Sequence, residues 1–93
     1  MNISFIVPVY NEAKNITSLV QKLKLISSYE YLCEVLIIDG GSIDGTKDIV
    51  KKLSFKLKSE FFKIIFLSNP KKLQAEALNI GLKNASNRFC VRL

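Results

Sequence analysis

The stretch "VLIIDGGSIDGT", Val35 to Thr46, joins an apolar run to an acidic, glycine-rich turn. Consecutive apolar residues without polar alternation are typical of a strand that is buried on both faces, as in a parallel sheet covered by helices. Asp39 ends the run, and the pair Gly40-Gly41 that follows permits positive φ and the close approach of another group. The stretch alone leaves open whether Asp39 only shapes the turn or also contacts a ligand.

The same strand signal occurs at four places along the chain, and a helical period separates each occurrence from the next. Strands are expected at residues 3–9, 33–39, 61–67 and 89–91. The first two helices are expected to bury two stripes of apolar residues: Ile16, Leu19, Val20, Leu23 and Ile26, then Ile49, Val50, Leu53 and Leu57. A third helix is expected over residues 73–85, and the candidate N-caps are Asn11 or Asn15 for the first helix and Asp44 for the second.

The β-α-β-α-β-α-β order predicts an α/β fold with a Rossmann-like parallel sheet of about four strands and three helices. Ligands of such sheets bind beyond the carboxyl ends of the strands, where the strand order reverses. The segments from Pro8 to Glu12 and from Asp39 to Gly45 leave two of these ends. A binding site is therefore expected between these two loops.

The composition limits the kinds of function. Ninety-three residues suit a single domain, and 48% hydrophobic with 24% charged residues is ordinary for a folded protein. Because the chain has no histidine, it excludes a Ser-His-Asp or Cys-His catalytic centre within itself. Fourteen basic and eight acidic residues give a net charge of +6, but lysines without interleaved aromatic residues do not favour nucleic acid as a partner.

The chain shows neither a membrane span nor a secretion signal. No apolar run approaches the roughly 20 residues of a transmembrane helix, and no basic leader precedes a cleavage site, so a cytoplasmic location is expected. Cys33 and Cys90 lie in separate apolar segments outside any Cys-x-x-Cys pair. They are expected to remain buried, reduced thiols rather than to form a disulfide or a metal site.

The two loops carry side chains suited to a nucleoside. Asp39 offers acceptors to the N–H or hydroxyl donors of a base or ribose. Tyr10 offers a flat face for stacking, and Glu12 offers further acceptors to a sugar. Structural roles are the alternative, with Asp39 or Ser42 capping backbone N–H groups and Tyr10 anchoring its loop. An aromatic residue and two carboxylates on adjacent strand ends together favour a nucleotide site.

The glycines match neither of the glycine-rich phosphate motifs. Gly40, Gly41 and Gly45 follow the second strand, whereas the dinucleotide fingerprint G-x-G-x-x-G follows the first. The P-loop pattern G-x-x-x-x-G-K-[ST] is absent. Neither a dinucleotide fold of that type nor a P-loop is therefore predicted.

Three segments in order resemble the N-terminal half of a family 2 glycosyltransferase of GT-A fold. They are "ISFIVPVYNEAKNI", "EVLIIDGGSIDGTKDIV" and "NPKKLQAEALNIGLKNASNRFCVRL", and together they cover essentially the whole chain. The resemblance implies the strand order third, second, first, fourth. It also implies that the complete enzyme transfers a sugar from an activated nucleotide to an acceptor hydroxyl.

The resemblance assigns donor contacts to both loops. The first loop would hold the base and ribose and the second would read the base edge, which gives the substrate-binding residues Pro8, Tyr10, Glu12, Asp39, Gly41 and Ser42. Two positions depart from the family pattern. Gly40 replaces a second acidic residue, and Leu78 replaces an arginine, so Lys71 or Lys72 is left as the candidate for the diphosphate.

In that family an Asp-x-Asp motif follows the fourth strand and holds a divalent metal on the donor diphosphate. The motif would begin just after Leu93. We therefore expect residues 1–93 to be a single nucleotide-binding subdomain that is truncated before the motif, without metal ligands, catalytic residues or turnover of its own. Mg or Mn is expected in the full-length enzyme. The alternatives are a non-catalytic nucleotide-binding or regulatory module, and an α/β domain that serves only assembly.

The implied strand order has further consequences. Cys33 and Cys90 would flank the first strand about 9–10 Å apart, beyond the roughly 7 Å Cα separation of a disulfide. Two helices would cover one face of the sheet and one helix the other, leaving a large part of the second face exposed and favouring self-association. The expected partners are a nucleotide-sugar, first a UDP-sugar, a second copy of the chain and, for the full-length protein, peripheral contact with a membrane.

Overall fold

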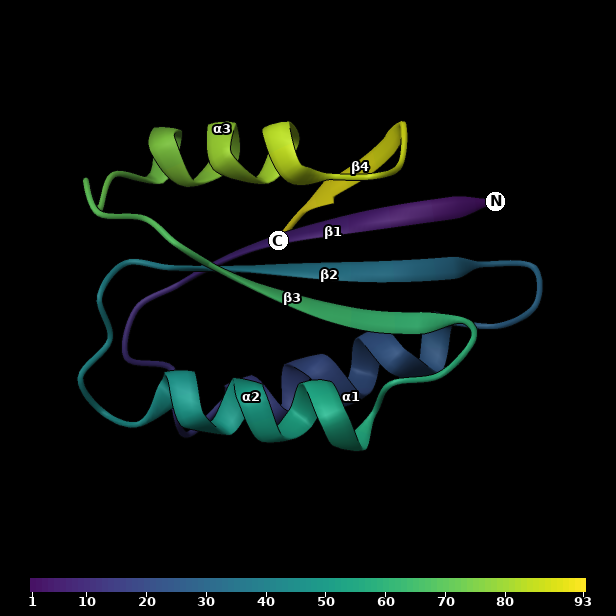
Figure 1. Cartoon of the computed structure of the whole chain (residues 1–93), viewed down its shortest axis with the longest axis horizontal. Coiled ribbons are helices and arrows are strands. Elements are labelled where there is room, and N and C mark those ends of the chain that lie inside the picture. Colours follow the sequence, from purple (N-terminus) through teal and green to yellow (C-terminus); the bar gives the residue numbers. More distant parts are fainter.

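The computed structural model describes all 93 residues, and four strands alternate in it with three helices (Figure 1). The strands are β1 (Asn2–Val9), β2 (Leu32–Asp39), β3 (Phe62–Ser68) and β4 (Phe89–Arg92). The helices are α1 (Ile16–Ile26), α2 (Thr46–Lys56) and α3 (Gln74–Asn84). Every expected element is present, and none of the helices is long and apolar enough to cross a bilayer.

All four strands are parallel and form one sheet in the order β3-β2-β1-β4. This is the predicted order. β1 and β2 are in register along their whole length, from Asn2 opposite Leu32 to Val9 opposite Asp39. The loops after β1 and β2 therefore leave the sheet side by side at the same edge.

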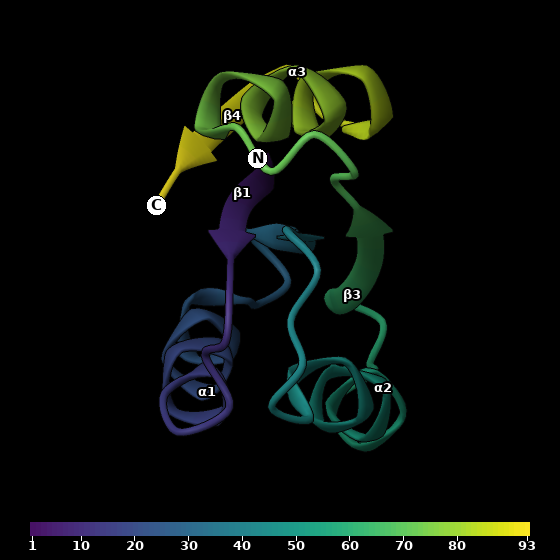
Figure 2. The same ribbon diagram turned by 90° about the vertical axis from the view of Figure 1, so that its left-hand side faces the viewer.

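The two faces of the sheet are covered unequally, as predicted: α1 and α2 lie on one face and α3 lies alone on the other (Figure 2). Strand alternation sends every second side chain to each layer. Phe5, Val35 and Ile37 belong to the larger core below the sheet, which also contains the buried stripes of α1 and α2. Ile6 and Leu36 belong to the smaller core under α3.

The helical stripes are largely as predicted, with differences at the helix ends. The residues of the predicted stripes that are buried are Ile16, Val20 and Leu23 in α1, then Val50 and Leu53 in α2. Ile26, the last residue of α1, was expected to be buried but is exposed, as side chains at a helix end have fewer neighbours than those in the middle. Asn15 occupies the N-cap position of α1, although its side chain makes no capping hydrogen bond.

The singly covered face is less exposed than expected from the sequence. Ile6, Leu36 and Ile38 are all buried, because α3 lies across the two central strands. Ile65 and Leu67 of the edge strand β3 are half-buried. The expectation that a large part of this face would be exposed is therefore wrong, and self-association stays a prediction.

The close approach of α3 depends on Gly81. A Cβ at this position would lie 2.5 Å from Cγ2 of Ile6, a separation that side-chain atoms do not adopt. The missing Cβ lets the helix backbone rest directly on β1.

The two cysteines are free thiols, as predicted. Cys33 of β2 and Cys90 of β4 lie on the two sides of β1, opposite Ile3 and Ser4. They also face different layers, since Cys33 packs into the larger core and Cys90 against the smaller one. Burial raises the pKa of the Cys33 thiol above its ordinary value. Cys90, expected to be buried, is half-buried because β4 is a short edge strand.

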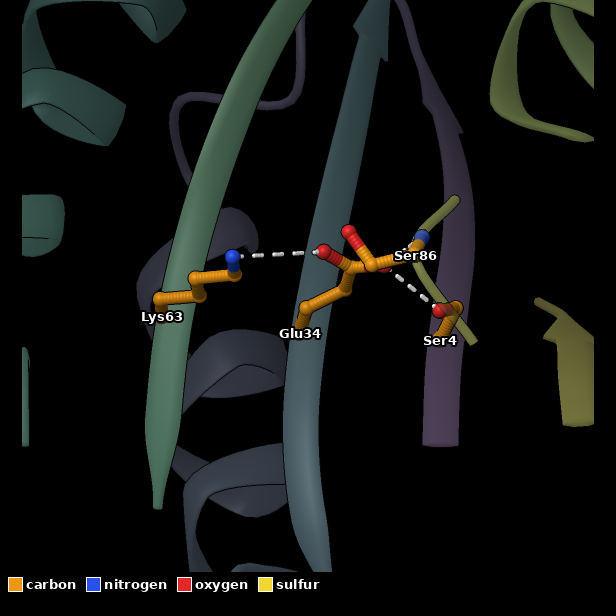
Figure 3. Close-up of polar contacts among 4 residues, drawn as sticks. All are labelled: Ser4, Glu34, Lys63 and Ser86. Atoms are coloured by element: carbon orange, nitrogen blue, oxygen red, sulfur yellow. Dashed lines mark hydrogen bonds and ion pairs between the residues drawn. The ribbon is translucent and has the colours of Figure 1, made fainter. Parts of the chain in front are cut away.

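One charged side chain lies inside the sheet layer (Figure 3). Glu34 of β2 is only 2% exposed. Its Oε2 accepts hydrogen bonds from the Ser4 hydroxyl at 2.6 Å and from the Ser86 backbone N–H at 2.5 Å. The ammonium group of Lys63 lies 3.7 Å from Oε1. Glu34 therefore ties the connection between α3 and β4 to the central strand, on a face where the sequence analysis expected only apolar residues.

Replacement of Gly81 by alanine is expected to lower the free energy of unfolding by about 1–3 kcal/mol, because overpacking against Ile6 outweighs the gain in helix propensity. Urea unfolding measures the change. Asn79→Ala, at an exposed position of the same helix, is the matched control and is expected to cost nothing. The Gly81→Ala cost should shrink in an Ile6→Ala background, and an undiminished cost there would contradict this packing explanation.

Replacement of Glu34 by alanine is expected to lower the free energy of unfolding by about 3 kcal/mol, because the Ser4 and Ser86 donors lose a buried charged acceptor. Lys63→Ala is expected to cost less than about 1 kcal/mol, because this lysine is largely exposed to water. Chemical denaturation of both variants checks the order. Equal losses would show that the ion pair with Lys63, rather than the two hydrogen bonds, accounts for the stabilising effect of Glu34.

Candidate functional site

A cleft of about 440 Å³ opens at the carboxyl ends of the central strands, as predicted for this fold. Ile38 and Ala77 contribute apolar surface to it. Its polar lining comes from the β1–α1 loop, the β3–α3 loop and the start of α3: Tyr10, Glu12, Asn69, Lys72 and Gln74. The cleft thus combines an apolar wall with an aromatic ring, a carboxylate and an ammonium group.

The loops after β1 and β2 are joined by hydrogen bonds. The N–H of Asn11, a residue with φ of 51°, donates to Ser42 Oγ at 2.7 Å, and Asn11 Oδ1 accepts the N–H of Ile43 at 2.8 Å. The N–H of Glu12 donates to Thr46 Oγ1 at 3.0 Å. Asn11, a candidate helix cap in the sequence, therefore links the two loops instead.

Asp44 strengthens the same connection. One of its carboxylate oxygens accepts the N–H of Thr46 and the other accepts the N–H of Ala13, both at 3.1 Å. The hydrogen bond from the Thr46 hydroxyl lowers the pKa of the Asp44 carboxyl below its ordinary value, and the hydrogen bonds from these backbone N–H groups lower it further by smaller amounts. The N-cap position of α2 belongs to Gly45, which has φ of 92°, so Asp44 precedes the position predicted for it. The two loops form one hydrogen-bonded unit.

Asp39 is turned into its own loop. Its Oδ2 accepts the N–H groups of Gly41 at 3.1 Å and Ser42 at 3.0 Å, while Oδ1 accepts the Ser42 hydroxyl. The side chain is only 7% exposed, and it does not line the cleft. The structural role considered from the sequence, capping of backbone N–H groups, is therefore confirmed, and contact of Asp39 with a ligand stays a prediction.

The six predicted site residues fall into two groups. Pro8, Tyr10 and Glu12 line the cleft. Asp39, Gly41 and Ser42 do not line it, and they shape and fix the loop beside it. Tyr10 is 55% exposed, so most of its ring is open to a ligand.

The structure distinguishes the two lysines considered for the diphosphate. Lys72 lines the cleft, and its Nζ lies 3.6 Å from the place where a Cβ on Gly41 would be. The Nζ of Lys71 lies 3.9 Å from Oε2 of Glu76 and outside the cleft lining. Gly41, with φ of 95°, thus leaves room for the Lys72 side chain.

Asn69 and Gln74 are polar lining residues that the sequence analysis missed, and Asn69 is the more buried of the two. Its N–H donates to the Asp39 carbonyl at 2.7 Å and its Nδ2 to the Leu73 carbonyl at 2.9 Å. Its Oδ1 is buried without a hydrogen-bond partner. The available signal was a polar amide directly after the third apolar strand, level with Asp39 at the end of the second. Asn69 joins β2, β3 and α3 at the edge of the cleft.

The order of the strands, the unequal helix layers and the position of the cleft define a GT-A type of α/β fold. The chain belongs to glycosyl transferase family 2, whose family model matches residues 4–93. This confirms the resemblance on which the expectations of fold and function depended.

Two relatives match almost the whole chain. The chain is 39% identical over 90 residues to the succinoglycan biosynthesis protein ExoA of Rhizobium meliloti. This match covers 95% of this chain and 26% of that protein. It is 38% identical over 89 residues to a dolichyl N-acetyl-alpha-D-glucosaminyl phosphate 3-beta-D-2,3-diacetamido-2,3-dideoxy-beta-D-glucuronosyltransferase of Methanococcus voltae, covering 96% and 27%. The chain thus spans about a quarter of the length of these relatives.

A solved structure agrees with the fold over the full chain. The S. aureus TarS 1-349 structure in complex with UDP superimposes with a TM-score of 0.78 at 32% identity, covering 100% of this chain and 27% of that one. The whole S. aureus TarS structure gives a TM-score of 0.77, again at 32% identity, covering 100% of this chain and 16% of that one.

The residues of this chain do not form a metal site. No group of three or more Cys, Asp or Glu side chains is close enough to hold an ion. Glu12 is the one carboxylate among the cleft-lining residues, while that of Asp39 is engaged by its own loop. The Mg or Mn expected in the full-length enzyme therefore has no set of ligands among these residues.

Asp39→Ala is expected to lower the free energy of unfolding by about 1.5–3 kcal/mol and to speed amide exchange at Gly41 and Ser42, because their N–H groups lose a charged acceptor. Urea unfolding and residue-resolved hydrogen exchange measure both effects. Ile43→Ala, at an exposed position of the same loop, is the control without this effect. Unchanged exchange at Gly41 and Ser42 in the Asp39 variant would refute the capping role.

Proposed function

We propose that the cleft binds the nucleoside diphosphate part of a nucleotide-sugar donor, first of all a UDP-sugar, and that the complete enzyme transfers the sugar to an acceptor hydroxyl. The observation that carries the proposal is the presence of an open aromatic ring, Tyr10, and an ammonium group, Lys72, in one cleft at the carboxyl ends of the strands. A nucleoside diphosphate presents the two complementary features, a flat base and an anionic diphosphate.

The base and ribose are assigned to the β1 side of the cleft. Tyr10 provides a face for stacking, and Pro8 adds apolar surface beside it. Glu12 Oε2 accepts a hydrogen bond from Asn15 Nδ2 at 3.3 Å, which leaves Oε1 to accept from a ribose hydroxyl. This assignment gives functions to three of the six residues expected from the sequence.

The diphosphate is assigned to Lys72 and to the start of α3. Gln74, the first residue of α3, lines the cleft, and no side chain caps this end of the helix. The N–H groups of an uncapped first turn and the helix dipole favour an anion. Lys72 adds a full positive charge beside them.

The comparisons support the donor class. The S. aureus TarS structure that matches the full chain was solved in complex with UDP. The Methanococcus voltae relative is named as a 2,3-diacetamido-2,3-dideoxy-beta-D-glucuronosyltransferase. Because this chain covers about a quarter of those proteins, transfer itself is proposed for the complete enzyme, with a divalent metal held by residues outside residues 1–93.

Calorimetric titration of the chain with UDP and with uridine tests the assignment of the base to Tyr10 and of the diphosphate to Lys72. Tyr10→Ala is expected to weaken both ligands about fivefold or more, because base stacking is lost. Lys72→Gln is expected to weaken UDP but not uridine, because only UDP carries the diphosphate.

Two controls accompany this titration. Lys71→Gln removes the same charge from the neighbouring residue outside the cleft, and Tyr31→Ala removes an exposed ring elsewhere, so neither should change UDP affinity. Equal weakening of UDP and uridine by Lys72→Gln would show that the lysine only supports the cleft. Absence of UDP binding by the wild-type chain would overturn the proposal.

A further inference from the structure

Two of the most exposed apolar side chains lie at equivalent places on α1 and α2. Leu25 is 86% exposed and Phe55 is 89% exposed, and each is the last residue but one of its helix. Each follows a buried leucine by two positions, Leu23 and Leu53. Two positions correspond to about 200° around an α-helix, so both side chains lie on the outer side of their helices.

The two helices form one layer under the sheet (Figure 2). Both run antiparallel to the strands, because each connects two parallel strands. Their last turns are therefore at the same end of the layer, whereas the cleft adjoins the loops that precede their first turns. Leu25 and Phe55 thus belong to one outer surface, at the end away from the cleft; we call it the helix-layer face.

Lysines surround both apolar side chains. Lys51 and Lys52 lie one turn before Phe55, and Lys58 lies about one turn after it. Lys22 lies one turn before Leu25. All four lysines are exposed, and none takes part in a salt bridge. Asp48 is the one acidic residue of α2, against four lysines. The helix-layer face is therefore basic, with exposed apolar groups among its charges.

We propose that the helix-layer face binds an anionic lipid surface, with Leu25 and Phe55 entering the interface and the surrounding lysines contacting the headgroups. A basic helical surface with protruding leucine and phenylalanine is the combination that binds such membranes, through apolar burial together with electrostatic attraction. Two features of the face select this occupant. A second copy of the same face would bring like charges together, and the single aromatic ring, Phe55, gives no series of rings on which successive nucleic-acid bases would stack.

This orientation leaves the cleft accessible. The lipid contacts lie at the last turns of α1 and α2, and the cleft lies at the opposite ends of the same helices. A soluble donor would reach the cleft from water while the chain stays on the surface. The inference itself does not depend on nucleotide binding, since it uses none of the residues of the cleft.

A tryptophan at position 55 gives a direct readout, because the chain has no tryptophan of its own. The fluorescence of Phe55→Trp should shift to the blue with phosphatidylcholine vesicles that contain phosphatidylserine, and brominated lipid should quench it. Leu82→Trp, at an exposed position on α3, is the matched control and should show neither effect. No shift at position 55, or equal shifts at both positions, would overturn the proposal.

Sedimentation with the same vesicles tests the lysines. Lys51→Gln/Lys52→Gln is expected to lower vesicle binding roughly fivefold for each lysine removed. Lys71→Gln/Lys83→Gln removes the same charge from the opposite side of the molecule and should lower binding far less. Equal losses for the two double variants would show that net charge alone attracts the chain to the vesicles, which would overturn the proposal that the helix-layer face binds them.

Two further measurements complete the test. Phe55→Ser and Leu25→Ser should each weaken vesicle binding, whereas Leu82→Ser should not, and thermal unfolding of every variant establishes that the fold is kept. Binding of the chain to a short DNA duplex but not to the vesicles would identify a nucleic-acid surface and reject the lipid. Light scattering that shows a dimer whose formation needs Phe55 would likewise assign the face to a second copy.

Discussion

The parallel pairing of β1 with β2 is the interaction on which the other features of the molecule depend. Its register places Val9 opposite Asp39, so that both strands end at the same level. The N–H of Gly40 donates to the Val9 carbonyl at 2.9 Å, which carries the pairing one residue into the loop. A slip by one residue would turn the apolar side chains of one strand from their own core to the other. It would also separate the two loops that border the cleft.

The two loops keep this alignment by an exchange of hydrogen bonds. Asn11 both donates to and accepts from the β2–α2 loop, and Asp44 accepts from both sides. These contacts satisfy backbone groups near the starts of both helices that would otherwise lack partners. Tyr10 and Glu12 are therefore held on a fixed framework, and the cost of ordering them for a ligand is already met on folding.

The strands and helices could be predicted because their strong signals are local, whereas the strand order came from the family resemblance. Apolar runs such as residues 33–39 and the helical spacing of residues 16–23 set the type and order of the elements, and right-handed crossovers determine the directions of the strands. The unequal helix layers followed from the implied strand order. The exposure of the sheet face under α3 could not be predicted from the sequence, because the contact of Gly81 with Ile6 joins residues far apart in the chain.

The site was predicted less completely than the fold, for a physical reason. Residue type and loop position predicted Tyr10 and Glu12, and the family resemblance added Pro8; all three line the cleft. They could not show that the Asp39 carboxylate turns to its own backbone, since that depends on a few torsion angles of the turn. The choice between Lys71 and Lys72 likewise depended on the fold, because adjacent side chains take different directions.

Glu34 also affects the molecule before folding is complete. Its backbone N–H partner, Ser86, lies 52 residues further along the chain. Until that segment arrives, the carboxylate on the face that α3 will cover lacks one of its two hydrogen-bond donors, and burial of a charge with incomplete hydrogen bonding is costly. The unfinished sheet therefore keeps this part of its face hydrated. Inward-pointing charges are one of the features that keep exposed sheet edges from pairing with other chains, so the residue that fastens the finished fold is of the type that disfavours association of an incomplete sheet.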